Sequence, residues 1–215
     1  KMKKTSLTFL ASALLMFSFS ALKADINVGV SIMAGSLDTS GSETEKVDLN
    51  TGNDINKKDL SESFVGGSIF IEKVLGNGIA LGIDYVPVDI DIGDGKRVDT
   101  AAVSENDSGT RTASASLEDL YTIYANVPFG SNGYYGLVGY HTVDVTTAET
   151  LNASSYGNVD LNGYQLGFGK KGDNYKLEAF YSDFDDISIT STGGSAAHVI
   201  NADADAMGIK LSFFY

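Results

Sequence analysis

The sequence contains no cysteine and no tryptophan, and it has only two prolines among 215 residues. Without cysteine the chain can form no disulfide, no thiolate metal site and no lipid-modified N-terminal cysteine. Basic residues are also scarce, because 15 lysines and arginines stand against 28 aspartates and glutamates. Such an acidic chain is a poor candidate for binding nucleic acid through a basic surface. No long stretch has helical periodicity, and the 24 glycines favour a single all-β unit.

Residues 1–24 have the three-part layout of a secretory signal peptide. Lysines at positions 1, 3 and 4 precede an apolar run from Leu7 to Phe19, and Ala24 offers a small residue for cleavage. The run is shorter than the roughly 20 residues that a transmembrane helix needs. We therefore expect a signal peptide over 1–24 and one domain over 25–215. Cleavage would remove four lysines and no acid, which leaves a net charge of −17.

The last nine residues alternate in polarity. Apolar side chains occupy every second position, which are Met207, Ile209, Leu211, Phe213 and Tyr215. This alternation predicts a β-strand with one apolar face. Combined with an export signal at the other end of the chain, it indicates a protein that passes through one membrane and folds in another.

Similar alternation recurs along the chain, so that eight strands are predicted in all. The segments are 26–34, 64–74, 79–92, 120–127, 134–145, 163–169, 175–182 and 207–215. Long polar segments (36–61, 93–116, 146–160 and 191–202) alternate with short turns (75–78, 128–133 and 170–174). Membrane barrels have short periplasmic turns and long outer loops. The predicted fold is therefore all-β, an eight-stranded antiparallel up-and-down transmembrane β-barrel with long extracellular loops and short periplasmic turns.

Two local patterns in these strands are less regular. The third segment changes parity at Val86 and Pro87, which predicts a bulge or a strand that rises clear of the membrane there. In the fifth segment both faces are similarly apolar, so its inner and outer faces stay unassigned.

Alternation alone does not distinguish a membrane barrel from a soluble barrel with its apolar face inward, but three features favour the membrane. The polar face is rich in glycine, alanine and serine, which suits a narrow eight-stranded interior. Tyrosines gather near strand ends, as in an aromatic girdle, and the predicted girdle is Tyr85, Tyr121, Tyr134, Tyr135, Tyr164, Tyr175 and Tyr215. Ionisable residues fall in mid-strand on the other face, namely Glu72, Asp84, Lys176, Glu178 and Lys210.

Charges inside a narrow barrel are costly unless they are paired. We therefore expect Lys210 and Lys176 to form interior ion pairs with Glu72, Asp84 or Glu178. The alternative is that these side chains are solvated near the barrel rims.

The signal peptide, the eight alternating segments and the final Ile209-to-Tyr215 strand resemble the small outer-membrane β-barrel families. The resemblance is to the transmembrane domain of outer membrane protein A and its opacity-type, porin-like relatives. It implies that Ile209, Leu211, Phe213 and Tyr215 form the assembly signal read by the barrel assembly machinery. The peptidoglycan-binding domain of full-length members is not expected here, because the sequence given ends with the last strand.

Catalytic and metal motifs are weak in this sequence. His141 and His198 are the two histidines, and no recognisable nucleophile motif surrounds them. We therefore expect His141 to be a girdle residue and His198 to be a loop residue. Acidic groups occur around Asp89, Asp183 and Asp203, but none matches a calcium-binding loop. We expect these carboxylates to be solvated charges on the surface. We expect no catalytic residue, no metal and no cofactor.

Three functions follow from this sequence. The leading hypothesis is a non-enzymatic integral outer-membrane protein of a Gram-negative bacterium, with a structural or surface-interaction role, a side-chain-filled interior and loops at the cell surface. The second is a small porin or an OmpW-like conduit for small or apolar solutes, and the third is an outer-leaflet enzyme acting on lipid A. The expected partners are outer-membrane lipid and lipopolysaccharide, the barrel assembly machinery and periplasmic chaperones, with no nucleic acid.

Overall fold

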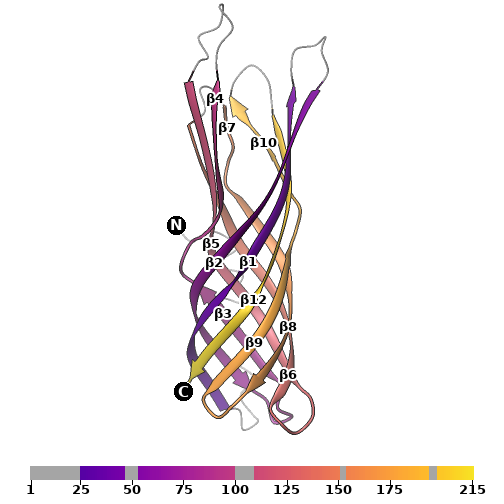
Figure 1. Ribbon diagram of the computed structural model, residues 1–215. Helices are drawn as coiled ribbons and strands as arrows, with labels where there is room; N and C mark the ends of the chain where they lie inside the picture. Colours follow the sequence, from indigo (N-terminus) through magenta and orange to yellow (C-terminus); the bar gives the residue numbers. More distant parts are fainter. Residues whose placement is uncertain (1–24, 47–52, 100–108, 151–153, 194–197) are drawn as a thin grey trace, which may run out of the picture.

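The computed structural model describes residues 25–46, 53–99, 109–150, 154–193 and 198–215, and the predicted signal peptide lies outside these ranges. The ten strands of the main sheet are antiparallel and wind around one axis (Figure 1). They are β1 (Asp25–Lys46), β2 (Asn53–Val74), β3 (Ala80–Val86), β4 (Ile90–Asp99), β5 (Gly109–Pro128), β6 (Tyr134–Glu149), β8 (Val159–Lys171), β9 (Tyr175–Phe184), β10 (Ile187–Thr190) and β12 (Val199–Phe214). A separate pair joins β7 (Ser154–Ser155) to β11 (Thr192–Gly193).

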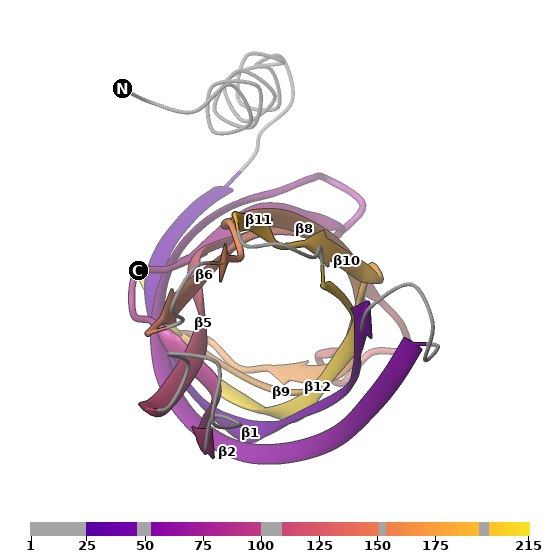
Figure 2. The same cartoon turned by 90° about the horizontal axis from the view of Figure 1, so that it is seen from above.

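The sheet closes on itself. The strand order is β1-β2-β3-β5-β6-β8-β9-β12, and β12 also pairs with β1, from Gly29 opposite Phe214 to Thr44 opposite Val199. Figure 2 shows the resulting ring from above. Because β3 and β4 both run along β5, and β9 and β10 both run along β12, the ring has eight strand positions. The predicted eight-stranded antiparallel barrel is confirmed.

Short turns lie at one end of the barrel and long hairpins at the other (Figure 1). Between β2 and β3, Gly78 has a positive φ of 84°, and its amide donates to the Leu75 carbonyl at 2.8 Å. Glycine adopts this backbone conformation without a steric penalty, which explains the Asn77-Gly78 pair. Within the described residues, no helix has the length and apolar character needed to cross a membrane.

Several strands are much longer than the sequence pattern predicts. The β1–β2 ladder runs without interruption from Asp25 opposite Val74 to Lys46 opposite Asn53, so most of the predicted 36–61 loop is strand. Likewise β4 and β5 extend into 93–116, β6 and β8 into 146–160, and β12 into 191–202. Most residues of these extensions are polar or small, with isolated apolar residues such as Leu37, Ile55 and Leu60, so the extensions carry little period-2 signal. Hairpin pairing satisfies their backbone groups.

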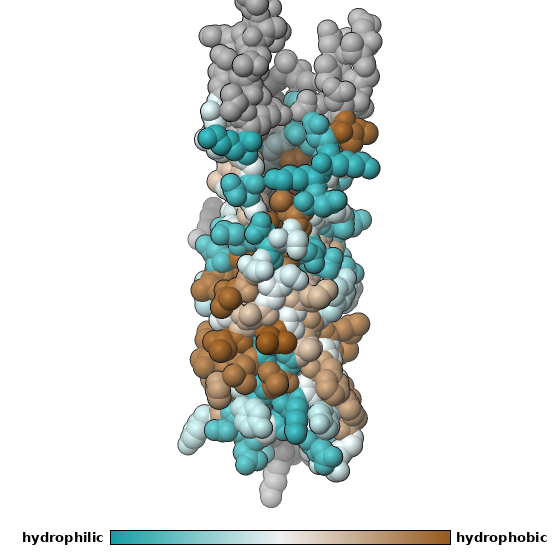
Figure 3. All heavy atoms as spheres, in the orientation of Figure 1, coloured by the Kyte–Doolittle hydropathy of each residue, from teal (hydrophilic) through white to brown (hydrophobic). Residues whose placement is uncertain are grey.

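The barrel has a membrane half and an outer half, separated by outward tyrosines at Tyr85, Tyr121, Tyr140, Tyr164 and Tyr181. In the membrane half, between these tyrosines and the short turns, apolar side chains cover the outside. Val30 is 56% exposed and Leu166 60% exposed, and Figure 3 shows the apolar residues as a brown belt. Such a belt suits contact with lipid.

The polarity is inverted in the outer half. Twelve buried apolar residues meet inside the barrel there; this outer core consists of Met33, Leu37, Val86, Ile90, Leu117, Val143, Val145, Leu161, Phe180, Phe184, Ala204 and Ala206. The outside of the same region is mostly hydrophilic, drawn in teal above the belt in Figure 3. A wall that faces water needs an apolar inner face, as in a soluble barrel.

The ladder is interrupted on two sides of the outer half. β2 and β3 pair only up to Ile69 opposite Tyr85, and beyond Pro87 the described part of β4 pairs with β5 alone. On the other side, β8 and β9 pair only up to Gly163 opposite Phe184, and β10 pairs with β12. The outer half therefore consists of two shells, one formed by β4, β5, β6 and β8 and the other by β10, β12, β1 and β2. Only the short β7–β11 pair joins the ladders of the two shells in the part of the chain that the structure describes.

Candidate functional site in the barrel interior

The first group of interior charges centres on Glu72. Its carboxylate is fully buried and accepts from Lys176 Nζ at 2.8 Å, Tyr124 Oη at 3.0 Å and Asn27 Nδ2 at 2.9 Å. Lys171, at the turn end, approaches to 3.5 Å. Lys176 also lies over the Phe70 ring, 4.2 Å from its centroid. The two charges are thus compensated by an ion pair, neutral donors and aromatic faces.

A second group lies nearer the outer half. Lys210 Nζ is 3.4 Å from Asp84 Oδ2 and 3.8 Å from Glu178 Oε2. Ser68 Oγ donates to Asp84 Oδ2 at 3.0 Å. Lys210 and Glu178 face each other across the β12–β9 ladder. One lysine here serves two carboxylates, so this group has a formal charge of −1.

The structure thus places all five residues predicted for interior ion pairs inside the barrel. They lie between 0% and 8% exposed, and their separation into two groups follows from the strand registers. Lys176 meets Glu72, whereas Lys210 meets both Asp84 and Glu178.

Most of the predicted girdle tyrosines point outward. Tyr164, Tyr175 and Tyr215 are exposed, while Tyr85 and Tyr121 stack on each other with ring centroids 4.5 Å apart. Tyr134 lies outside, 5.3 Å beneath Lys170 Nζ. The terminal-strand residues Ile209, Phe213 and Tyr215 are exposed on the outer face, and Leu211 is partly exposed.

Tyr135 differs from the prediction, because its side chain lies inside the barrel at 4% exposure. Adjacent residues in a strand point to opposite faces, so Tyr134 and Tyr135 cannot both belong to the girdle. The inner position is available because Gly169 stands opposite Tyr135: a Cβ at Gly169 would lie 2.4 Å from the Tyr135 ring.

His141 is also interior, not part of the girdle as expected. Its ring is 2% exposed, with Nδ1 2.8 Å from Thr122 Oγ1 and Nε2 2.9 Å from Ser182 Oγ. Gln165 Nε2 donates to Ser182 Oγ at 3.3 Å. The signal that could have identified this position is its shared parity with Val143 and Val145, which belong to the outer core. A hydroxyl, not a carboxylate, orients the ring, so the serine and histidine lack the acid of a catalytic triad.

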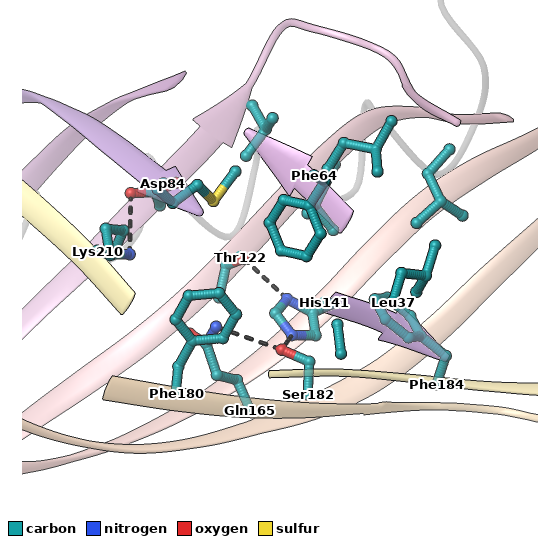
Figure 4. A pocket seen from close by; sticks show the side chains of 16 residues that line it. Leu37, Phe64, Asp84, Thr122, His141, Gln165, Phe180, Ser182, Phe184 and Lys210 are labelled. Atoms are coloured by element: carbon teal, nitrogen blue, oxygen red, sulfur yellow. Dashed lines mark hydrogen bonds and ion pairs between the residues drawn. The ribbon is translucent and has the colours of Figure 1, made fainter. Parts of the chain in front are cut away.

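A cavity separates the charged groups from the outer core. The cavity is small, with a volume of about 40 Å³. Figure 4 shows Thr122, His141, Gln165 and Ser182 on one side of it, with Leu37, Phe64, Phe180 and Phe184 nearby. Asp84 and Lys210 also line it. A second cavity, at the turn end, is bounded by Glu72, Lys171 and Tyr135. The Glu72 and Lys210 groups thus lie between two separate cavities.

Acidic residues form cross-strand rows on the outer half. Asp205 stands opposite Asp38 on β1 and Asp183 on β9, and Glu118, Asp144 and Asp160 form a second row. Among the described residues, no three acidic or histidine side chains gather closely enough to hold a metal ion. Burial raises the pKa of the Asp205 carboxyl, and the negative charges of Asp38, Asp183 and Asp203 raise this pKa further.

Replacing Asp205 with asparagine should therefore stabilise the protein at pH 7. A raised pKa in the folded state means that ionisation of Asp205 opposes folding above that pKa. The gain should be a few tenths of a kcal/mol to about 1 kcal/mol, as for cross-strand charge pairs. It should disappear as the pH falls below about 4, where the carboxyl is protonated in both states. Urea unfolding in phospholipid vesicles at several pH values measures this difference.

The matched control is Asp59→Asn. Asp59 is an exposed aspartate on β2 that faces Ser40 across the ladder, so no like charge is relieved. A gain from Asp59→Asn equal to that from Asp205→Asn, or a gain independent of pH, would contradict the repulsion in the Asp205 row.

Comparison with known proteins finds similarity in architecture only. No protein-family model matches the chain, and no curated protein matches it significantly. Among solved structures, the outer membrane protein OprG from Pseudomonas aeruginosa is 14% identical, with a TM-score of 0.48, covering 87% of this chain and 96% of OprG. AlkL, solved in lipid bilayers, is 14% identical with a TM-score of 0.48, covering 92% of this chain and 95% of AlkL. Neisserial surface protein A is 12% identical with a TM-score of 0.44, covering 88% of this chain and 97% of that protein.

Proposed function

We propose that this integral outer-membrane β-barrel of a Gram-negative bacterium is a non-conducting surface protein, with a structural and interactive role. The observation that supports the proposal is the filling of its interior at two successive levels. The Glu72 and Lys210 groups occupy the membrane half, and the outer core occupies the outer half. A porin needs a continuous aqueous passage, and this arrangement disfavours one.

The outer half supports the interactive part of the proposal. Its strands continue well beyond the outward tyrosines and are held together by a packed apolar core. Leu37 and Val143 are 2% and 1% exposed. Burying a leucine or valine side chain stabilises by about 1.5–3 kcal/mol. A protein that only spanned the bilayer would need no such extension, whereas one that presents a rigid surface to partners would.

The proposed partners follow from the outer surface. Lipopolysaccharide and outer-membrane lipid would contact the apolar belt and the tyrosines. The outward residues of the last strand, Ile209, Leu211, Phe213 and Tyr215, suit the role of an assembly signal for the barrel assembly machinery, after delivery by periplasmic chaperones. A catalytic role has less support, because the Ser182–His141 pair lacks a carboxylate partner and is enclosed in the barrel.

Single-channel recording tests the proposal. The purified protein, inserted into planar lipid bilayers, should give no reproducible stepwise current, because ion pairs and packed apolar side chains replace water along the axis. Heat-modifiable gel migration of the same sample verifies that the barrel is folded, and a known porin provides the positive control. Discrete, reproducible conductance steps from the folded protein would contradict the proposal.

A further inference from the structure

Three aromatic rings form one cluster on the outside of the barrel, at the end with the short turns. The ring centroid of Phe129 is 6.4 Å from that of Tyr134 and 5.6 Å from that of Phe168, and the centroids of Tyr134 and Phe168 are 5.7 Å apart. Phe129 and Phe168 are 47% and 51% exposed, so the cluster faces the lipid. We call these three rings the aromatic platform.

Strand register explains why the platform forms. Tyr134 stands opposite Lys170 in the β6–β8 ladder, and Phe168 precedes Lys170 by two residues on the same face of β8. Tyr134 and Phe168 are therefore diagonal neighbours, which aromatic side chains are long enough to bridge. The β5–β6 turn adds Phe129, whose amide donates to the Tyr134 carbonyl at 3.0 Å.

Lys170 extends over the platform without an acidic partner. Its side chain is exposed, and its Nζ lies 5.3 Å from the centroid of the Tyr134 ring. The adjacent Lys171 differs, because its Nζ lies 3.5 Å from the Glu72 carboxylate. Among the described residues Lys170 forms no ion pair, although the chain has 28 acids for 15 bases and Asp173 is only three residues away. An unpaired cation in so acidic a chain indicates a negative partner outside the protein.

The outer face of β8 presents three kinds of side chain in succession. From the turn toward the middle of the membrane half, Lys170, Phe168 and Leu166 occupy alternate positions, about 6.6 Å apart. Leu166 is exposed and stands opposite Val138, which is also exposed. The sequence of cation, aromatic ring and aliphatic surface matches the sequence of phosphate, glycerol ester and acyl chain in a glycerophospholipid.

The charge of the surface favours a lipid of net negative charge. Short turns lie on the periplasmic side of a membrane barrel, so Lys170 is at the level of the headgroups of the periplasmic leaflet. A lysine there attracts an anionic headgroup. A zwitterionic headgroup would bring its own ammonium close to Lys170, and residues 128–134 of the adjoining turn include no acid to receive it.

We propose that Lys170 and the aromatic platform bind one glycerophospholipid of net negative charge from the periplasmic leaflet. The lipid phosphate pairs with Lys170 Nζ, the glycerol region lies against the platform, and an acyl chain follows Leu166 and Val138. This inference rests on the lipid contact in the proposed function and makes that contact specific. It does not depend on whether the barrel conducts.

Native mass spectrometry of the folded protein tests the site. Phosphatidylglycerol and phosphatidylethanolamine with identical acyl chains compete at equal concentration for the protein in detergent micelles, and the masses of the complexes identify the first lipid bound. Phosphatidylglycerol should be preferred about fivefold, the factor that corresponds to about 1 kcal/mol for one lysine near an anionic headgroup.

Variants of Lys170 separate this site from general charge attraction. Lys170→Gln should remove the preference, and Lys170→Arg should keep it, because arginine also pairs with phosphate. Lys57→Gln is the matched control, since Lys57 is an exposed lysine on β2 in the outer half, away from this leaflet. Phe168→Ala should weaken the binding of both lipids while their ratio stays the same, because the platform contacts the part that they share.

Three results would overturn the site. They are equal binding of the two lipids by the wild type, an undiminished preference in Lys170→Gln, and an equal loss of preference in Lys57→Gln. Heat-modifiable migration of each variant verifies that the barrel is folded before lipid binding is measured. Conductance recordings on the same samples keep the two proposals apart: current steps would contradict the non-conducting role alone, and equal lipid binding would contradict this site alone.

Discussion

Replacing Glu72 with leucine should lower the free energy of unfolding by about 3–5 kcal/mol, the usual cost of breaking a buried ion pair. The change leaves Lys176 buried beside the Phe70 ring without the carboxylate that lies 2.8 Å from it. It also removes the acceptor used by Tyr124 and Asn27. Urea titration in phospholipid vesicles, followed by the gel shift between folded and unfolded barrel, measures the loss.

The double variant Glu72→Leu with Lys176→Met should recover most of that loss. Removing both charges eliminates the uncompensated lysine, and apolar side chains of similar volume often replace buried ion pairs without cost. Glu62→Leu is the control, because Glu62 lies on the same strand but is exposed to solvent. If the double variant were as unstable as Glu72→Leu, the loss would come from packing and not from the unpaired charge.

Replacing Leu37 with alanine should cost about 2–5 kcal/mol, as expected for a large side chain removed from a packed core. Leu37 is 2% exposed and lies in the outer core. Because the outer core lies in the outer half and not among the ion-pair groups of the membrane half, the loss of stability should be local to the outer half. In limited proteolysis of intact vesicles, the protease should cut the outer half of Leu37→Ala faster than that of the wild type. The membrane half should stay folded, as shown by an unchanged difference in gel migration between heated and unheated protein.

Leu166→Ala provides the comparison. Leu166 is 60% exposed on the apolar belt, so the same truncation removes contacts with lipid and opens no cavity in the protein. It should leave the proteolysis rate of the outer half unchanged. Equal acceleration by Leu37→Ala and Leu166→Ala would show that the outer half does not depend on its own core.

The sequence pattern predicted most of the membrane half, because lipid imposes a strict period of two. The exception is β6, whose two faces are similarly apolar and whose Tyr135 lies inside. The other strands there alternate between outward apolar residues, such as Ile209 and Phe213, and small or charged inward residues, such as Lys210 and Ser212. The parity of Glu72, Lys176 and Lys210, opposite to that of the outward apolar residues on the same strands, indicates the inner face. Their partners depended on strand register, which one sequence does not specify.

The outer half was not predicted, because its strands lack that alternation. Residues 38–46 of β1 are polar or small on both faces, and residues 53–63 of β2 are polar apart from Ile55 and Leu60. Their pairing becomes evident only when Leu37, Leu117 and Leu161, far apart in the sequence, are found together. For the same reason the assignment of His141 to the girdle was wrong, since its interior position depends on Thr122, Gln165 and Ser182 from three other strands.

The two interruptions in the ladder divide the barrel into a stiff part and a compliant part. Widening the ring within the bilayer would break backbone hydrogen bonds at every strand pair, including the β1–β12 closure. Separating β2 from β4 would break mainly side-chain contacts, such as the bond from Lys58 Nζ to the Asp94 carbonyl at 3.2 Å. Large excursions should accordingly be confined to the β2–β4 side of the outer half, with the shells pivoting near Pro87, because the β7–β11 pair joins them on the other side. The lipid-embedded cylinder should keep its diameter.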